Sequence, residues 1–193
     1  MTTRQNPHPK VHQLFVDRWS PRAFDESAIP EDDLRAIFAA AGLAPSAFNT
    51  QPWKFLYARR GDANWDRFLS LLIPFNQSWA KDAGVLIFIV SDTKMRQGEK
   101  ESDHYSHSFD AGAAWAQMAL QATLLGYHAH GMTGVDFPQA HEELGVPPGF
   151  RIEAAVAIGR RDHPDRLPEG LREREAPSGR KAVDEIAVAG NFR

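Results

Sequence analysis

The chain has 193 residues, of which 42% are hydrophobic and 24% charged, and its net charge at pH 7 is −3. This length and composition are typical of one globular domain, residues 1–193, and exclude a disordered chain. The near balance of charge excludes a general electrostatic attraction to nucleic acid or to an anionic membrane surface, so any anion site must be local.

Further classes are excluded by what the sequence lacks. There is no cysteine, which excludes disulfides, thiolate nucleophiles and Cys-based metal centres. The G-x-G-x-x-G, Walker, G-x-S-x-G and H-E-x-x-H motifs are also absent. The first residues show no signal-peptide core, and no later run approaches the roughly 20 apolar residues of a membrane helix, so we expect a cytoplasmic protein without membrane contact.

The first half of the chain predicts helices that alternate with strands. Residues 10–17 favour a short helix, and a clearer helix follows Pro30, where apolar residues recur at intervals of three and four up to Gly42. Residues 53–59 alternate like a half-buried strand. After a further helix around Trp65 to Leu72, the apolar run 85–90 predicts a central strand that helices cover on both faces.

The second half begins with a polar stretch, 92–108, which predicts a surface loop or a mobile segment able to act as a lid. Residues 109–126 are small or apolar nearly all round, which is typical of a helix buried on several sides or at a subunit interface. A strand at 129–135, a short helix at 138–144 and a strand at 152–159 complete the compact part.

From residue 160 the chain is rich in Arg, Pro and Glu, and only the stretch KAVDEIAV is apolar enough to pack. We therefore treat residues 160–193 as a C-terminal extension. It is too polar to form a core, and we expect it to extend along a partner subunit.

Two motifs carry candidate chemistry. In DRWSPRAFD, Arg18, Ser20 and Arg22 alternate, so an extended backbone would point two cations and a hydroxyl at one anion such as a phosphate. In LAPSAFNTQPWKF, Asn49 and Gln51 offer donors and acceptors that suit a flat heterocycle. Taken separately, a solvated turn and a plain helix-to-strand loop explain these two segments equally well.

Together, RWSPRAFDE and APSAFNTQPWKF closely resemble the motifs of the nitroreductase family of FMN-dependent oxidoreductases, in the form seen in its small bacterial, flavin-reductase-like branch. The order of segments is similar over nearly the whole chain. The resemblance implies an α+β fold, a three-layer sandwich with a central, mostly antiparallel sheet flanked by helices. It also implies a homodimer with FMN at the subunit interface and a C-terminal tail that extends over the partner.

The resemblance implies roles for residues near the FMN phosphate. Arg18, Ser20 and Arg22 match the phosphate-binding motif, and Trp19 contributes mainly its backbone. Arg180, in SGRKAVDEI, matches a late basic residue near the phosphate. A second late basic residue has no clear match in this chain.

Other matches concern the flavin ring. The loop that reaches the flavin of the other subunit corresponds to Pro45, Ser46, Ala47 and Asn49, with Gln51 adjacent. Asn76 matches an asparagine at the pyrimidine edge, and Thr133 and Gly134 match a segment whose backbone N–H approaches flavin N5. Many relatives have Glu where this chain has Thr133.

The implied activity is transfer of two electrons from NADH or NADPH, through FMN, to a small planar acceptor in a ping-pong cycle. Nitroaromatics, quinones and free flavin are the acceptors, and a flavin-dependent monooxygenase is a possible partner. Binding and positioning are most of the protein's contribution, so no residue is assigned as catalytic. A specialised enone or aldehyde reductase or dehydrogenase, and a non-catalytic flavin-binding protein, are the alternatives.

Four histidines fall in two pairs that bear on a metal site. His104 and His107 lie in the polar stretch and give only a weak indication of a metal site, so we expect no metal. His128 and His130 face one side of a strand, and we interpret them as structural residues with satisfied hydrogen bonds.

Overall fold

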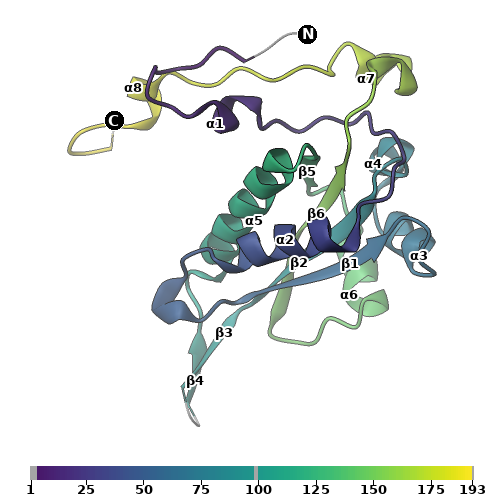
Figure 1. Ribbon diagram of the computed structural model, residues 1–193. Helices are drawn as coiled ribbons and strands as arrows, with labels where there is room; N and C mark the ends of the chain where they lie inside the picture. Colours follow the sequence, from purple (N-terminus) through teal and green to yellow (C-terminus); the bar gives the residue numbers. More distant parts are fainter. Residues whose placement is uncertain (1–3, 98–99, 193) are drawn as a thin grey trace.

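A four-stranded antiparallel sheet in the order β1-β2-β6-β5 forms the centre of the computed structural model, which describes residues 4–97 and 100–192 (Figure 1). Its strands are Trp53–Arg59 (β1), Val85–Asp92 (β2), His128–Met132 (β5) and Phe150–Gly159 (β6). Every neighbouring pair is antiparallel. The predicted central antiparallel sheet is therefore confirmed.

The sheet separates two apolar clusters, because consecutive residues of a strand point to opposite faces. In β2, Leu86 and Phe88 belong to one cluster, whereas Ile87 and Ile89 belong to the other. All four side chains are buried. A strand that is apolar on both faces needs cover on both faces, as we predicted for this one.

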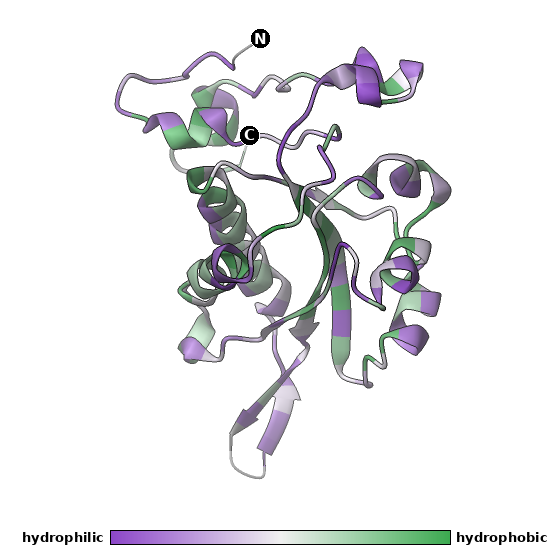
Figure 2. Cartoon of the chain, turned by 45° about the vertical axis from the view of Figure 1, so that its right-hand side comes forward, coloured by the Kyte–Doolittle hydropathy of each residue, from purple (hydrophilic) through white to green (hydrophobic). Residues whose placement is uncertain are grey.

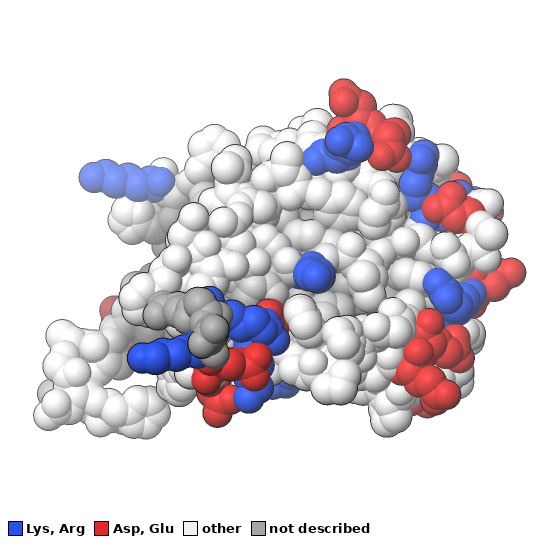
Figure 3. Space-filling view, turned by 90° about the horizontal axis from the view of Figure 1, so that it is seen from below, with Lys and Arg blue, Asp and Glu red and all other residues white. Residues whose placement is uncertain are grey.

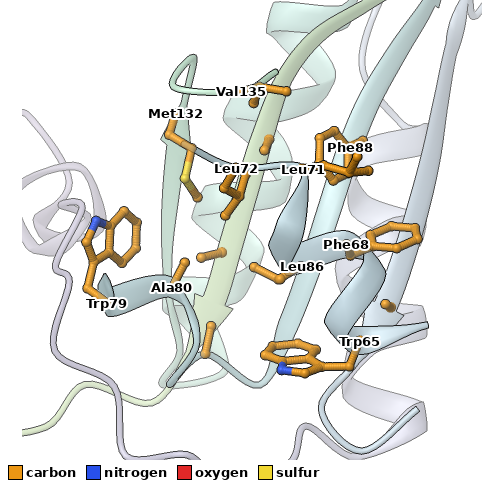
Figure 4. Packing of buried hydrophobic residues seen from close by; sticks show 14 of the residues in the cluster. Trp65, Phe68, Leu71, Leu72, Trp79, Ala80, Leu86, Phe88, Met132 and Val135 are labelled. Carbon is orange, nitrogen blue, oxygen red and sulfur yellow. The ribbon is translucent and has the colours of Figure 1, made fainter. Parts of the chain in front are cut away.

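Helices supply that cover. The larger ones are Glu31–Gly42 (α2) and His107–Leu124 (α5) on one face, and Trp65–Ser70 (α3), Pro74–Ala80 (α4) and Phe137–Glu143 (α6) on the other. Figure 4 shows the second face, where Phe68 of α3 packs on Phe88 of β2, and Trp79 of α4 belongs to the same buried cluster. The three-layer sandwich is confirmed.

The short elements are Gln13–Asp17 (α1), Ala47–Asn49 (η1), Pro164–Arg166 (η2), Glu169–Arg172 (α7) and Val183–Ile186 (α8). Helix α2 begins after Pro30 with three acidic residues in its first turn, which favours this end through the helix dipole. Helix α5 buries Ala111, Ala114 and Ala119, and these small side chains let it lie close to the sheet. No helix in the described ranges combines the length and the apolar character needed to cross a membrane.

For the stretch 92–108 we predict a surface loop or a mobile segment, but the structure shows mainly a β-hairpin there. Its strands are Lys94–Gln97 (β3) and Lys100–Asp103 (β4), which project from the rest of the molecule (Figure 1). Lys94 pairs with Asp103 at 2.7 Å, and Arg96 pairs with Glu101 at 3.1 Å. The prediction failed because cross-strand ion pairs, rather than an apolar face, accompany this pairing.

The extension 160–193 divides into two parts. Residues 160–172 pack on the domain, since Phe24 and Arg161 form an isolated β-bridge and Leu167 and Leu171 are buried in the core. The following residues are mostly exposed and hydrophilic, and they run along the N-terminal segment (Figures 1 and 2). In α8, Val183 and Ile186 are exposed, so KAVDEIAV does not pack on its own chain.

Candidate functional site

The segment that carries Arg18, Ser20 and Arg22 leaves α1 in an extended conformation. Burial alternates along it, because Trp19 and Pro21 are buried whereas the other three residues are half-buried. Trp19 is held by an edge contact with the ring of His128. The two arginines and the serine therefore share one side of the segment, as an extended backbone requires.

A cavity of about 300 Å³ opens on this side. It gathers residues from the 18–22 segment, from β5 and from both ends of the chain: Arg4, Trp19, Ser20, Arg22, His130, Arg174, Ala176, Ser178 and Arg180. Thus the structure brings Ser20 and Arg22 together with Arg180, which lies far from them in sequence. Our sequence analysis did not single out Arg4 or Arg174, since no pattern there distinguishes them from surface arginines.

Arg22 lacks an acceptor in the described structure. Its Nε is buried without a hydrogen-bond partner among the described residues. Glu175 lies nearby, and its Oε1 accepts from the backbone N–H groups of Arg22 and Ala23, at 2.7 and 3.0 Å. Its Oε2 is buried without a hydrogen-bond partner among the described residues, and its charge opposes the lowering of the Arg22 pKa by burial. Because a buried donor without an acceptor is costly, this geometry fits an anion in the cavity.

Two histidines of β5 stay neutral near these cations. Burial lowers the pKa of His130 to about 4, and the charge of Arg22 adds to this effect. Burial and the charges of Arg161 and Arg18 lower the pKa of His128 to about 4 as well. His130 Nδ1 lies 2.9 Å from the carbonyl oxygen of Pro21, as expected of a structural histidine.

His128 differs from our expectation. Its Nδ1 is buried without a partner in the described part of the chain. The alternation along a strand indicates to which face the His128 side chain points, but not whether its Nδ1 finds a hydrogen-bond partner there.

A second group of predicted residues meets beyond the end of β5. Asn76, on α4, is buried, and its Nδ2 donates to the carbonyl oxygen of Gly134 at 3.0 Å. A Cβ atom at Gly134 would lie 2.4 Å from that nitrogen, so a larger residue would displace the Asn76 amide from its hydrogen bond. The strand ends at Met132 rather than continuing to residue 135, which leaves Thr133 exposed in the following turn.

A short stretch of chain joins the cavity to this second group. His130 lines the cavity, and three strand-like residues span only about 10 Å. Thr133 therefore lies at most about 10 Å along the chain from His130, and Asn76 joins Gly134 through its hydrogen bond.

The loop with Pro45, Ser46, Ala47, Asn49 and Gln51 lies elsewhere. It follows α2 at the end of the molecule opposite to the 18–22 segment (Figure 1). Three of its residues have positive φ, namely Phe48, Asn49 and Gln51. Ser46 Oγ accepts from the backbone N–H of Gln51 at 3.0 Å, which fixes this unusual turn. One chain therefore does not bring this loop to the cavity.

Buried polar groups hold the loop on the N-terminal end of α5. Asp110 Oδ2 accepts from the backbone N–H of Ala47 and from Ser106 Oγ, both at 3.1 Å, and lies 3.5 Å from His104 Nε2. His104 and Asp110 are each 2% exposed. His104 Nε2 is also 3.4 Å from Thr50 Oγ1. No local sequence pattern indicates this network, because its members are distant in the chain.

His107 belongs to a neighbouring cluster. Its Nδ1 lies 2.8 Å from Ser91 Oγ, and Ser91 donates to Glu153 Oε1 at 2.6 Å. Among the described residues, no group of three or more His, Cys, Asp or Glu side chains is arranged to hold a metal ion.

The charge distribution elsewhere contrasts with the cavity. Seen from the hairpin side, basic and acidic side chains are interspersed along the periphery (Figure 3). The cavity, in contrast, is lined by four arginines, and none of its described lining residues is acidic.

Comparison with known proteins identifies a family whose model matches this chain. The model of the nitroreductase family matches residues 16–74 and 72–160. A crystal structure described as an oxidoreductase containing FMN is 48% identical and superposes with a TM-score of 0.96, covering 98% of this chain and 96% of the other.

Two curated relatives are also similar. An NADH dehydrogenase of Thermus thermophilus is 31% identical over 75% of this chain and 83% of its own length. An enone reductase of conjugated linoleic acid (CLA) biosynthesis in Lactiplantibacillus plantarum is 25% identical over 76% of this chain and 83% of its own. The family match covers most of the chain, including the 18–22 segment and the 45–51 loop. The chain belongs to the nitroreductase family.

Proposed function

We propose that this protein is an FMN-dependent NAD(P)H oxidoreductase. The observation that carries the proposal is the arginine-lined cavity next to the 18–22 segment, which in a nitroreductase-family chain fits the phosphate of FMN. The similarity to an FMN-containing oxidoreductase at 48% identity supports the same cofactor.

The residues present suit FMN. Arg18, Arg22 and Arg180 supply guanidinium donors and Ser20 a hydroxyl, which together give the charge-assisted hydrogen bonds that a phosphate dianion needs. The unpaired Nε of Arg22 gains an acceptor. The buried indole ring of Trp19 keeps this segment in place, which leaves the backbone of Trp19 to contribute to the phosphate site.

Beyond the phosphate, Asn76, Thr133 and Gly134 would bind the ring. Glycine at 134 lets the backbone approach a flat ligand closely, and the amide of Asn76 offers a donor and an acceptor to the pyrimidine edge. No side-chain acid or base is assigned to the reaction, so binding and orientation are the protein's contribution.

The loop of Pro45, Ser46, Ala47 and Asn49, with Gln51 adjacent, would complete the site from a second copy of the chain. Its distance from the cavity within one chain supports this arrangement. Large apolar side chains on α1, α5 and α8 are exposed in the single chain and would be covered in a homodimer: Phe15, Phe109, Leu124, Val183 and Ile186.

The proposed reaction oxidises NADH or NADPH and reduces a small planar acceptor, such as a nitroaromatic, a quinone or free flavin, in two alternating half-reactions. When bound, FMN accepts a hydride and passes two electrons on. Reduced flavin delivered to a monooxygenase partner is one use of this activity.

The visible absorption of purified protein, before and after anaerobic addition of NADH or NADPH, tests the proposal. We expect an FMN spectrum that bleaches with at least one nicotinamide. Failure of FMN both to co-purify and to bind on addition would refute it. An FMN spectrum that neither nicotinamide bleaches would indicate the alternative, a non-catalytic flavin-binding protein.

A specialised reductase is a second candidate, because the enone reductase of L. plantarum is a relative. The projecting hairpin could then narrow the acceptor pocket. A steady-state panel of nitroaromatics, quinones, enones and aldehydes separates the two candidates. One dominant acceptor favours the specialised enzyme, whereas turnover of many favours the broad one.

The tail also has a proposed role in the dimer. Since Leu167 and Leu171 belong to the core, removing everything from residue 160 would damage the domain itself. Truncation after Glu175 keeps these contacts and removes α8. We expect the molar mass measured by light scattering to shift from dimer toward monomer, and an unchanged dimer would contradict this role.

A further inference from the structure

Four guanidinium groups line one cavity and a fifth lies close by, and although the charge of Glu175 favours the cationic form of Arg22, no carboxylate forms a salt bridge with any of the five in the described part of the chain. Arg4, Arg22, Arg174 and Arg180 line it, and Arg18 lies beside Arg4, whose Nη1 donates to the carbonyl oxygen of Arg18 at 3.2 Å. None of the five forms a salt bridge with a carboxylate in the described structure. This contrasts with Arg59, Arg96 and Arg166, which all pair with acidic residues.

The cations come from opposite ends of the chain. Arg4 belongs to the N-terminal segment, and Arg174 and Arg180 belong to the tail. Arg4 Nε and Arg180 Nη1 both donate to the carbonyl oxygen of Ser178, at 3.1 and 3.3 Å. Two like charges thus meet at one neutral acceptor, which leaves their mutual repulsion without compensation.

The pKa values reflect this crowding. The pKa of Arg4 is lowered by burial and then by the charges of Arg180 and Arg18. The pKa of Arg18 is lowered by burial and then by Arg180. An anion in the cavity would remove the repulsion and supply the missing acceptors.

We propose that Arg4 and Arg174 complete, with Arg18, Arg22 and Arg180, a site for a phosphomonoester dianion, and that this phosphate fastens the N-terminal segment to the C-terminal tail. The inference rests on the proposed function, in which the phosphate is that of FMN. Such a phosphate carries a charge of about −1.5 to −2 and three acceptor oxygens, enough to join donors from several segments.

Hydrogen bonds rather than buried apolar contacts hold the two segments: Arg4 donates to the carbonyl oxygens of Arg18 and Ser178, and Glu175 accepts from the backbone of Arg22 and Ala23. Most residues of 4–12 and of 173–182 are exposed, and none of them belongs to the buried core. Segments with few buried contacts open at low free-energy cost, so a ligand that joins them changes their order more than that of the core.

Binding measurements test the ligand set. Affinities for FMN and for riboflavin, which lacks the phosphate, are measured by flavin fluorescence for wild type, Arg4→Gln and Arg174→Gln. The matched control is Arg35→Gln. The side chain of Arg35, on α2, is 77% exposed, and its Nη1 forms only a long ion pair, 3.9 Å, with Glu31 Oε1. We expect each cavity variant to weaken FMN about tenfold or more, with riboflavin unchanged and the control like wild type.

Hydrogen exchange of wild-type protein tests the fastening without relying on a variant. FMN and inorganic phosphate are expected to slow exchange in 174–182 and in 4–12, whereas riboflavin does not. In Arg4→Gln, protection of the tail by FMN should decrease. Equal protection by FMN and riboflavin, or equal FMN affinity in Arg4→Gln, Arg174→Gln and Arg35→Gln, would overturn the inference.

The outcomes separate the two proposals. If wild type binds FMN but the cavity variants bind it equally well, the inference fails and the proposed function stands. If wild type binds inorganic phosphate but not FMN, the proposed function fails and the phosphate site stands. If it binds neither, both fail.

Discussion

The cavity of the 18–22 segment and the 45–51 loop differ in how their polar groups are satisfied. In the loop, the buried carboxylate of Asp110 accepts from Ala47 and Ser106 and lies near His104, so the chain itself supplies every partner. In the cavity, arginines from distant segments meet with no acidic residue among the described lining residues, and Arg22 Nε has no acceptor in the described structure, although the charge of Glu175 acts on Arg22. The loop is preformed, whereas the cavity depends on a ligand for its charge balance.

The largest effect should come from removing the central cations of the cavity. Arg18→Ala with Arg22→Ala is expected to weaken FMN on the order of 100-fold or more, because each charged hydrogen bond contributes about 1.5–3 kcal/mol. Flavin titration measures the loss, and circular dichroism checks the fold. Full FMN retention would refute the phosphate assignment and remove the contrast between the two regions.

Asp110→Asn tests whether the loop is preformed by its own network. The amide keeps the shape of the carboxylate but loses the charge that attracts His104 and part of its acceptor capacity. We expect the free energy of unfolding to fall by about 2 kcal/mol. Urea denaturation measures it, with Asp66→Asn, an exposed residue of α3, as a control within about 0.5 kcal/mol of wild type. Equal stability of the two variants would mean that the network does not hold the loop.

Two variants of Asn49 distinguish the role of its side-chain amide from the role of the loop backbone. Asn49→Ala is expected to weaken FMN about tenfold and to leave the proposed dimer intact, since under the proposed function this amide makes one polar contact with the FMN of the partner. Asn49 has a φ of 55°, which alanine disfavours and glycine does not. If Asn49→Gly binds FMN normally while Asn49→Ala does not, the effect belongs to the backbone rather than to the amide.

The last prediction concerns pH. His128 and His130 have a pKa of about 4 in the folded state, against 6.5 ordinarily. Above pH 6.5 they are neutral in both states and impose no penalty. As the pH falls from 6.5 to about 4, the unfolded state binds more protons, so stability falls over that window. Urea midpoints measured across it should decline less steeply in His128→Gln than in wild type. An identical slope would exclude His128 as a contributor.

The sheet was the most predictable part of the molecule. The run 85–90 is apolar at every position, and this alone indicates a strand with two covered faces. The short helix α4 was missed because Pro74 to Ala80 mixes polar and aromatic residues without a clear period. The hairpin was missed because its strands are matched by charge, which sequence alternation alone does not reveal.

The site was predictable only in pieces. The alternation of Arg18, Ser20 and Arg22 follows from an extended backbone, and the structure shows it. That Arg4 and Arg174 line the same cavity follows from chain ends that meet in space, which no local pattern encodes. Likewise, the link from Asp110 to Ala47 joins residues 63 positions apart in the sequence.

The hydrogen bond from Arg4 to the carbonyl oxygen of Ser178 has a practical consequence for anyone who prepares this protein. A purification tag fused ahead of Met1 begins only a few residues from the cavity, and a histidine tag adds groups that become cationic near pH 6. Flavin titrations should therefore use protein from which an N-terminal tag has been cleaved. A tag at the other end is no safer a choice, because it extends the tail that carries Arg180.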